Sequence, residues 1–186
     1  MIKLNKIYTK TGDNGDTALG NGQRVLKDSL RVNAYGNVDE LNASIGVVTL
    51  YATPDLKRKL KSIQNDLFDL GADLCVPISE NNNGRLRVST SQIETLEAEI
   101  DEMNNILNPL NSFILPGGCK SATFLHLART ICRRAERSVV SLRSKEEIND
   151  NTLIYLNRLS DWLFVASRVE NQENSTEVLW SPGKNK

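Results

Sequence analysis

The chain has 186 residues, 39% of them hydrophobic, and a formal net charge of zero, with 23 Lys+Arg against 23 Asp+Glu. This length and balance predict a single globular domain over residues 1–186 that buries its core without disulfide or metal staples. The lack of a basic excess argues against nucleic acid as a partner, because nucleic-acid-binding domains neutralise phosphates with lysine and arginine. No run approaches the ~18 apolar residues of a membrane span, so no membrane partner is expected either.

Three cysteines and one histidine limit the metal chemistry of the chain. Cys75, Cys119 and Cys132 form no CxxC pair, and His126 is the only histidine, which excludes a structural zinc site of the usual spacing. The odd number of cysteines and the lack of an apolar leader indicate a reducing, cytoplasmic location. We interpret His126 as a packed histidine rather than a ligand or a base.

The N-terminal part of the chain differs in composition from the remainder. Residues 1–37 are rich in Gly, Asp, Asn, Thr and Lys and show no apolar period, which predicts an irregular segment. Apolar residues then recur at spacings of three and four, the pattern of amphipathic helices. The first such stripe begins at Val38 and the second at Leu56. Residues 76–90 interrupt the pattern and are predicted to form a loop.

The second half of the chain carries three more helical stripes. A capping box that begins at Ser91 (SQIE) predicts the start of the third helix. Two further stripes begin at Ala122 and Leu153, and residues 173–186 are predicted to form a tail. Five helices without an alternating strand pattern or an internal repeat predict an all-α fold. We therefore expect a five-helix bundle over residues 38–172, preceded by the irregular N-terminal segment.

The fourth predicted helix carries a stripe of arginines. Arg129, Arg133 and Arg137 recur every four residues, so they lie along one side of the helix. A solvated helix face with one Arg–Glu pair would give the same pattern. However, neighbouring like charges repel, and arginine rather than lysine favours planar, bidentate contacts to phosphate or carboxylate. The stripe is therefore a candidate anion-binding face.

Two further groups of polar residues point to a site. In the loop TKTGDNGDT at 9–17, glycines let backbone N–H groups approach an anion, and Lys10 adds a positive charge. The loop is not a Walker A motif, and a plain Gly/Asp turn would have the same composition. On the fifth helix, Asn157 and Asp161 are one turn apart, beside Arg158. These residues form either part of a polar site or an ordinary polar helix face.

These motifs together resemble a known family. The segments TKTGDNGDT at 9–17, RVLKD at 24–28, YGNVDELN at 35–42, FILPGG at 113–118, RRAER at 133–137 and YLNRLSDWLF at 155–164 are similar to the signature blocks of the PduO-type ATP:cob(I)alamin adenosyltransferases. The blocks occur in the family's order and span nearly the whole chain. Asn33 and Ser167 depart from the family pattern, which has Glu and Ala there.

The resemblance implies a fold, an activity and partners. It implies a homotrimer of five-helix bundles, with active sites between subunits, that transfers the 5′-deoxyadenosyl group of ATP to cob(I)alamin and releases tripolyphosphate. It implies Mg²⁺ held mainly through ATP, with no metal ligand assigned among the side chains, and a corrinoid bound base-off so that Co(II) can be reduced. A flavin-type reductase and an adenosylcobalamin-dependent enzyme are the implied partners.

The resemblance also assigns roles by position. The residues implied to bind ATP are Thr9, Lys10, Thr11, Gly12, Thr17, Ala18, Lys27, Arg133, Arg134, Ala135, Glu136, Arg137 and Asn157. The residues implied to serve catalysis are Lys10, Phe113, Arg133 and Arg137. Phe113 matches the aromatic beneath the corrin, although core packing is its alternative role, and Trp180 is predicted to meet the corrin as well. Asp39 and Arg129 match an intersubunit salt bridge.

Three other functions are compatible with parts of the pattern. A nucleotide-gated carrier would bind and hand over adenosylcobalamin without turnover, whereas an enzyme releases more tripolyphosphate than there are sites. A structural bundle with a solvated arginine face would show no ATP-dependent rise in Tm. A different ATP-using enzyme, such as a kinase, would release ADP or AMP.

Overall fold

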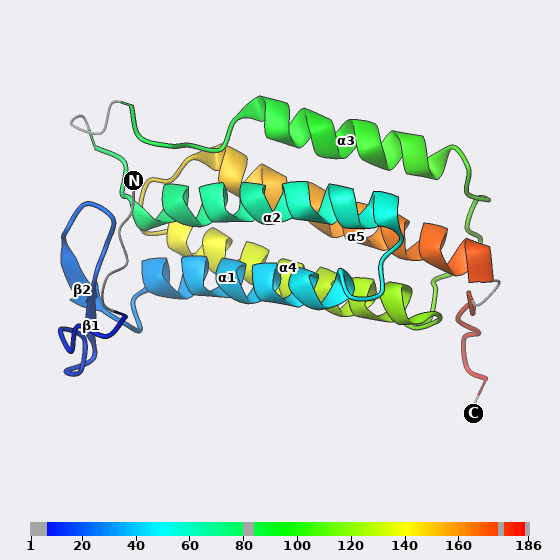
Figure 1. Cartoon of the computed structure of the whole chain (residues 1–186), viewed down its shortest axis with the longest axis horizontal. Coiled ribbons are helices and arrows are strands. Elements are labelled where there is room, and N and C mark those ends of the chain that lie inside the picture. Colours follow the sequence, from blue (N-terminus) through cyan, green and yellow to red (C-terminus); the bar gives the residue numbers. More distant parts are fainter. Residues whose placement is uncertain (1–6, 80–83, 175–176, 185–186) are drawn as a thin grey trace.

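The computed structural model describes residues 7–79, 84–174 and 177–184. Within these residues the chain forms five helices and a small hairpin (Figure 1), which confirms the predicted all-α five-helix bundle. The helices are α1 (Leu30–Val48), α2 (Pro54–Cys75), α3 (Thr90–Asn104), α4 (Lys120–Arg143) and α5 (Asp150–Asn174). The hairpin pairs β1 (Asp16–Ala18) with β2 (Arg24–Leu26) in antiparallel register, Thr17 opposite Val25.

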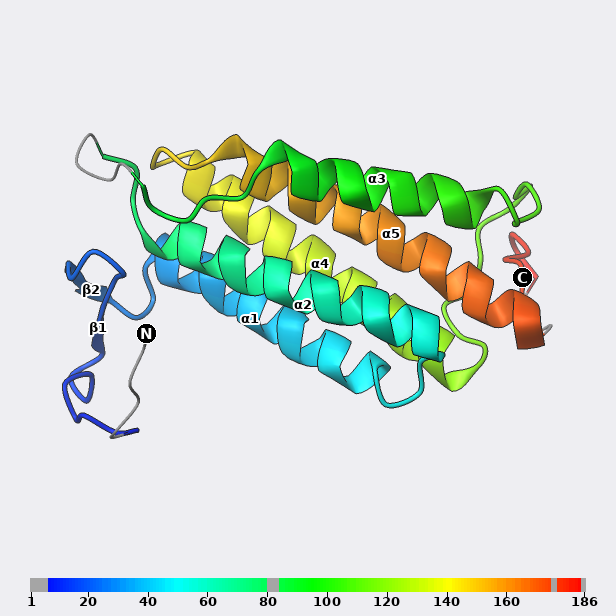
Figure 2. The same cartoon turned by 45° about the horizontal axis from the view of Figure 1, so that its top comes forward.

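The helices form an elongated bundle with two distinct ends. α4 packs against both α1 and α5, α1 packs against α2, and α3 covers α5 from outside (Figures 1 and 2). The β1–β2 hairpin lies at one end, beside the start of α1, and the α3–α4 connection and the C-terminal segment lie at the other. α4 has 24 residues and is therefore about 36 Å long. None of the described helices is both long and apolar enough to cross a membrane.

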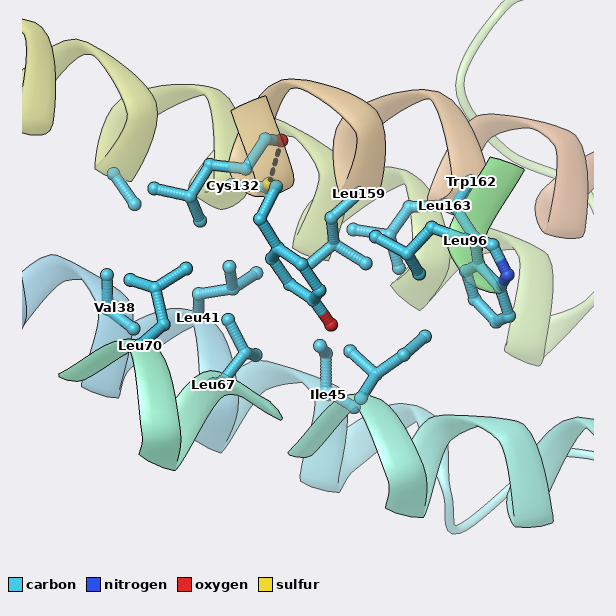
Figure 3. Close-up of a cluster of buried hydrophobic side chains, with 14 of the residues drawn as sticks. Val38, Leu41, Ile45, Leu67, Leu70, Leu96, Cys132, Leu159, Trp162 and Leu163 are labelled. Atoms are coloured by element: carbon cyan, nitrogen blue, oxygen red, sulfur yellow. Dashed lines mark hydrogen bonds between the residues drawn. The ribbon is translucent and has the colours of Figure 1, made fainter. Parts of the chain in front are cut away.

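The core is made by the apolar stripes that the sequence shows. Leu41 of α1, Leu67 of α2 and Leu159 of α5 are almost completely buried and point into one cluster (Figure 3). Cys132 of α4 is buried in the same cluster, and its thiol donates to the carbonyl of Leu156 at 3.2 Å. Burial raises the pKa of Cys132 far above its ordinary value, so this thiol packs as a small apolar residue.

The first helix begins eight residues before the predicted start at Val38. Ser29 caps it, because its Oγ accepts a hydrogen bond from the N–H of Val32. Arg31 follows in the first turn and is buried, where its guanidinium binds Glu146 and the carbonyl of Leu74. A charged residue in a core position interrupts the apolar spacing by which the sequence predicts a helix. Its partner, Glu146, is distant in the chain and gives no local signal.

Two other boundaries also differ from the sequence prediction. The N-cap of α3 is Ser89 rather than Ser91, since the N–H of Ser89 binds Oε1 of Gln92 at 2.9 Å. A buried carboxylate, Asp73, fixes this start by accepting a hydrogen bond from the N–H of Val88 at 2.8 Å. The predicted tail is partly helical and partly paired, because α5 continues to Asn174 and the described residues 177–184 contact the α3–α4 connection.

Candidate functional site

At the hairpin end, two basic side chains hold the glycine-rich loop in place. Arg24 of β2 donates to the carbonyl of Thr11 at 2.6 Å and to Oδ2 of Asp16 at 2.9 Å. Lys27 donates through Nζ to the carbonyl of Gly12 at 2.8 Å. The hydrogen bond from Arg24 lowers the pKa of Asp16 below its ordinary value. The loop therefore has a defined shape in which the backbone carbonyls face these cations.

Lys10 has an uncommon backbone conformation within this loop. Its φ is 61°, in the left-handed region that residues other than glycine rarely adopt. The Oγ1 atoms of Thr9 and Thr11, on either side, are hydrogen-bonded at 2.8 Å, and all three side chains are exposed. A strained non-glycine residue between exposed donors is typical of a binding site.

The hairpin is fixed to the bundle through its turn. Leu19 is buried, and the N–H of Gly20 donates to the carbonyl of Cys75 at 3.1 Å. A Cβ at Gly20 would lie 2.7 Å from Cγ2 of Val76, so only glycine allows this close approach. The end of α2 thereby sets the position of the glycine-rich loop.

Along α4, the arginine stripe is mostly unpaired. Among the described residues, the side chains of Arg133 and Arg137 are exposed and make no hydrogen bond or ion pair. Arg129 is half-buried, with its Nε buried and unpartnered and its guanidinium 6.0 Å from the ring of Phe164. Burial lowers the pKa of Arg129. Three neighbouring guanidinium groups without a carboxylate form a site suited to an anion.

The other ATP-binding candidates on this helix are in different environments. Arg134 forms an ion pair with Glu40 of α1. Glu136 accepts a hydrogen bond from the amide of Asn157 on α5 at 2.9 Å, so these two candidates do lie together. Ala135 is fully buried in the core. Its side chain is therefore directed away from the exposed face that carries the other candidates, so only its backbone could contact ATP.

At the opposite end of the bundle, Phe113 is exposed rather than packed in the core. Phe113 is 77% exposed and Trp180 is 45% exposed. Their ring centroids are 6.1 Å apart. The N–H of Trp180 donates to the carbonyl of Phe113 at 2.6 Å, and the N–H of Leu115 donates to the carbonyl of Val178 at 2.9 Å. These residues and Leu179 form an exposed apolar surface, here called the apolar platform (Phe113, Leu115, Val178, Leu179, Trp180).

Sequence reasoning missed the contacts that build both ends. Arg24 and Gly20 shape the hairpin end, yet each is an ordinary turn or strand residue in the sequence. The pairing of the C-terminal segment with the FILPGG segment is equally hidden, because Ile114 and Leu179 form a single β-bridge. The exposed apolar run at 178–180 was the available signal, since such residues outside a helix need a partner.

The structure does not bring all of the candidates together. The β1–β2 hairpin, which adjoins the glycine-rich loop and Lys27 in the sequence, lies at one end of the bundle (Figures 1 and 2). The α3–α4 connection and the C-terminal segment, which carry Phe113 and Trp180, lie at the other end. Asp39 of α1 lines a groove of about 380 Å³ with Phe68 of α2, whereas Arg129 faces α5 through Phe164. Asp39 and Arg129 therefore face different sides of the α1–α4 pair. The chain carries two separated groups of candidate residues.

Comparison with known proteins gives a consistent result. The family model described as cobalamin adenosyltransferase matches residues 7–170. The chain is 46% identical over 190 residues to a corrinoid adenosyltransferase of Mycobacterium leprae, covering 98% of each chain. It is 49% identical over 171 residues to a corrinoid adenosyltransferase of Bacillus subtilis, covering 89% of this chain and 86% of the relative.

A solved structure has the same fold. It is a variant of a PduO-type ATP:corrinoid adenosyltransferase from Lactobacillus reuteri, complexed with cobalamin and ATP, with a TM-score of 0.89 and 39% identity. The match covers 94% of this chain and 99% of that chain.

Proposed function

Because this chain belongs to the cobalamin adenosyltransferase family, we propose that it transfers the 5′-deoxyadenosyl group of ATP to cob(I)alamin, giving adenosylcobalamin and tripolyphosphate. The chain is an enzyme of the corrinoid adenosyltransferase class. Its residues suit that reaction. The hairpin end offers Lys10, Lys27 and exposed threonines for a triphosphate, α4 offers unpaired arginines, and the apolar platform offers a surface for a corrin face.

The separation of the two ends is the observation that carries the proposed assembly. α4 spans about 36 Å, so a hairpin that binds ATP cannot deliver its C5′ atom to a corrin on the platform of the same chain. Adenosyl transfer needs the reacting atoms within about 3–3.5 Å. We infer that a complete site takes its hairpin from one copy and its platform and arginine stripe from another, in a closed homotrimer.

The charges on the two sides of the bundle support this assembly. Asp39 is exposed beside the groove of α1 and α2, and Arg129 has a buried Nε without a partner. Because they face different sides of one chain, an ion pair between them would join two chains. Such a contact would place the middle of α1 beside α4 of the neighbouring copy, with the hairpin about two and a half turns away along α1.

The proposed chemistry requires no nucleophilic side chain. Cobalt(I) of the substrate attacks C5′ of ATP, the Co–C bond forms, and the C5′–O bond breaks as tripolyphosphate leaves with the electron pair. Lys10 and Lys27 from one copy, and Arg133 and Arg137 from the other, stabilise the charge that develops on the leaving group. Glu136 and Asn157 orient each other beside these arginines.

Magnesium fits this arrangement as part of the nucleotide. Among the described residues, no group of three or more His, Cys, Asp or Glu could hold a metal ion, and Asp16 in the hairpin is already paired with Arg24. We propose that Mg²⁺ is bound mainly through ATP oxygens, where it would offset phosphate charge.

The apolar platform suits base-off binding of the corrinoid. Phe113 has no donor atom and would exclude water and a lower axial ligand from cobalt, which favours reduction of Co(II). We propose that a flavin-type reductase supplies the electron and that an adenosylcobalamin-dependent enzyme receives the product. The chain could both turn over and deliver its product, because release into solution and transfer to a dependent enzyme both start from the same bound adenosylcobalamin.

The direct test is anaerobic incubation with cob(I)alamin, ATP and Mg²⁺, followed by identification of the corrin and the released phosphate. The proposal expects adenosylcobalamin and tripolyphosphate, with tripolyphosphate in excess of the number of sites. Release of ADP or AMP would contradict it, and a stoichiometric burst without turnover would favour a carrier.

A further inference from the structure

The segments that carry the apolar platform have little regular structure of their own. Residues 105–119 connect α3 to α4, and the described residues 177–184 follow α5, with one β-bridge between them. A surface built from two irregular segments keeps its shape only if other parts of the molecule fix the backbone. The fixing contacts come from the last turns of α5.

Asn171 of α5 binds the FILPGG segment at two points. Its Oδ1 accepts a hydrogen bond from the N–H of Cys119 at 3.0 Å, and its Nδ2 donates to the carbonyl of Gly117 at 3.0 Å. Asn171 is 1% exposed. Gly118, between the two bonded residues, has a φ of 110°, and a Cβ there would overlap the amide of Asn171. The turn is therefore shaped around this one side chain.

Arg168, one turn earlier, binds both irregular segments. Its Nε donates to Glu177 at 3.2 Å in the C-terminal segment, and its second guanidinium nitrogen donates to the carbonyl of Asn108 at 2.8 Å in the α3–α4 connection. Arg168 is 7% exposed. Gln172 adds a hydrogen bond to the carbonyl of Ile106 at 3.2 Å. The three side chains lie on one side of α5, because Asn171 and Gln172 follow Arg168 by three and four residues.

Arg168, Asn171 and Gln172 hold the two segments through hydrogen bonds rather than through close apolar packing. A cavity of about 290 Å³ is lined by Leu107, Asn108, Arg168, Asn171, Gln172 and Glu177. Because apolar packing does not fill this space, hydrogen bonds hold the segments in place. Loss of one donor would let a segment shift into the cavity without breaking the helical core.

We propose that Arg168 and Asn171 are positioning residues that set the place of Phe113 and Trp180 relative to the end of α5. This inference rests on the proposed function, since it assigns the platform to the corrin. Neither side chain reaches the exposed surface. They act by holding the carbonyl of Gly117, the N–H of Cys119 and the carboxylate of Glu177, from which the two halves of the platform extend.

The test uses the two tryptophans of the full chain as reporters. Trp180 is on the platform and Trp162 is fully buried in the bundle, so 5-fluorotryptophan labelling gives one ¹⁹F resonance for each, assigned with Trp180→Phe. Arg168→Gln and Asn171→Ala are compared with wild type in the absence of substrates. KM is then measured for cob(I)alamin and for ATP, together with Tm.

Asn149→Ala provides a matched control at the other end of the bundle. The amide of Asn149 also joins two segments, since it donates to Asp73 at 2.7 Å and to the carbonyl of Val88 at 2.8 Å. Its loss removes similar hydrogen bonds but leaves the platform untouched. It therefore measures what general destabilisation does to the same readouts.

We expect both α5 variants to shift or broaden the Trp180 resonance and to leave that of Trp162 in place. The KM for cob(I)alamin should rise about tenfold, the scale of one lost hydrogen bond, while the KM for ATP stays within about twofold. The control, Asn149→Ala, should change neither the Trp180 resonance nor the ratio of the KM for cob(I)alamin to the KM for ATP. An unchanged Trp180 resonance in both variants would overturn the inference, and so would equal losses for both substrates that follow Tm and recur in Asn149→Ala. Failure of the wild type to form adenosylcobalamin would contradict the proposed function instead, while the ¹⁹F spectra would still decide whether α5 sets the platform.

Discussion

The two ends of the bundle are built from opposite chemistries. The hairpin end is polar: Arg24 and Lys27 bind backbone carbonyls and shape a loop that exposes Lys10 between two threonines. The other end is apolar: Phe113 and Trp180 lie side by side on the surface, on segments without a helix of their own. The first suits a triphosphate and the second suits a flat, apolar ring system.

This difference is the basis of our proposal that one chain holds two halves of a site rather than one complete site. In that proposal each half is completed by groups from another copy, because the length of α4 separates the two ends of one chain. The unpaired arginines lie between the two ends, on the helix that joins them. Changes at either end should therefore affect one substrate each, and changes at the contact between copies should affect both.

The largest effect is expected at the contact between copies. If Asp39 and Arg129 pair across subunits, Asp39→Asn leaves a partly buried guanidinium without its charge partner, at a cost of ~3–5 kcal/mol to assembly. Light scattering should show weaker association, with activity lost in parallel. The charge exchange Asp39→Arg with Arg129→Asp should restore part of both.

Asp101→Asn is the control for this prediction, because Asp101 is an exposed carboxylate on α3. It should leave association and activity unchanged. A fully active wild-type monomer in solution would contradict the pairing.

The arginine stripe gives the next largest effect. Arg133→Lys keeps the charge but loses the bidentate geometry, so it should cost ~2–4 kcal/mol in the transition state, the scale of a lost preorganised donor. The measurement is kcat/KM for ATP. Arg143→Lys, in an ion pair with Asp150 at the end of the same helix, should change little. Wild-type kcat/KM in Arg133→Lys would remove that residue from the triphosphate site.

Phe113→His tests the apolar end alone. The ring is exposed, so the free energy of unfolding should change by no more than about 0.5 kcal/mol. An imidazole beneath the corrin would offer cobalt an axial ligand and disfavour reduction. We expect the rate from cob(II)alamin with a reductant to fall at least ~10-fold more than the rate from pre-reduced cob(I)alamin, or ~1.4 kcal/mol in activation free energy. Equal losses in both assays would place the corrin elsewhere.

The smallest effect concerns a group that belongs to neither end. Burial, and then the charge of Arg129, lowers the pKa of His126 below 6.5, while Glu177 opposes this shift. Below pH 6.5 the unfolded chain therefore takes up a proton that the folded chain excludes. Stability should fall as the pH drops from 6.5, by at most about 1.4 kcal/mol per pH unit, until the folded pKa is reached.

His126→Gln removes this pH-dependent contribution to the free energy of unfolding, since the chain has no other histidine. Urea midpoints at pH 7.5, 6.0 and 5.0 should show a flatter acid side in the variant. An identical slope in wild type and variant would mean that folding does not change the pKa of His126.

Much of the fold could be predicted from the sequence, because apolar periodicity is local. The stripes that start near Val38 and Leu56 became buried helix faces, and His126 is buried as expected. The predicted start of α1, at Val38, was wrong because Arg31 occupies a core position. A buried arginine there depends on the carboxylate of Glu146 beside it. A pattern of neighbouring residues cannot contain that partner.

The candidate site was predictable only as residue types. Spacing predicted the arginine stripe, and composition predicted the glycine-rich loop, but neither indicates that the loop and Phe113 lie at opposite ends. The contacts of Asn171 and Arg168 could not be predicted either, since a buried amide or guanidinium has the same sequence pattern as a solvent-exposed polar helix face. Long-range geometry decides these points.

Mixing subunits tests the central claim, that one site takes its two halves from two copies. Lys10→Ala damages the hairpin end and Phe113→Ala the apolar end, and each variant alone should be nearly inactive. Co-expressed in equal amounts with different tags and purified through both, they should form mixed oligomers in which some sites have both halves intact. Random assembly in a closed ring gives about one quarter intact sites, so about one quarter of the wild-type rate is expected before enrichment by the tags. Mixed oligomers as inactive as either variant would contradict the account, because every chain would then carry its own complete, and damaged, site.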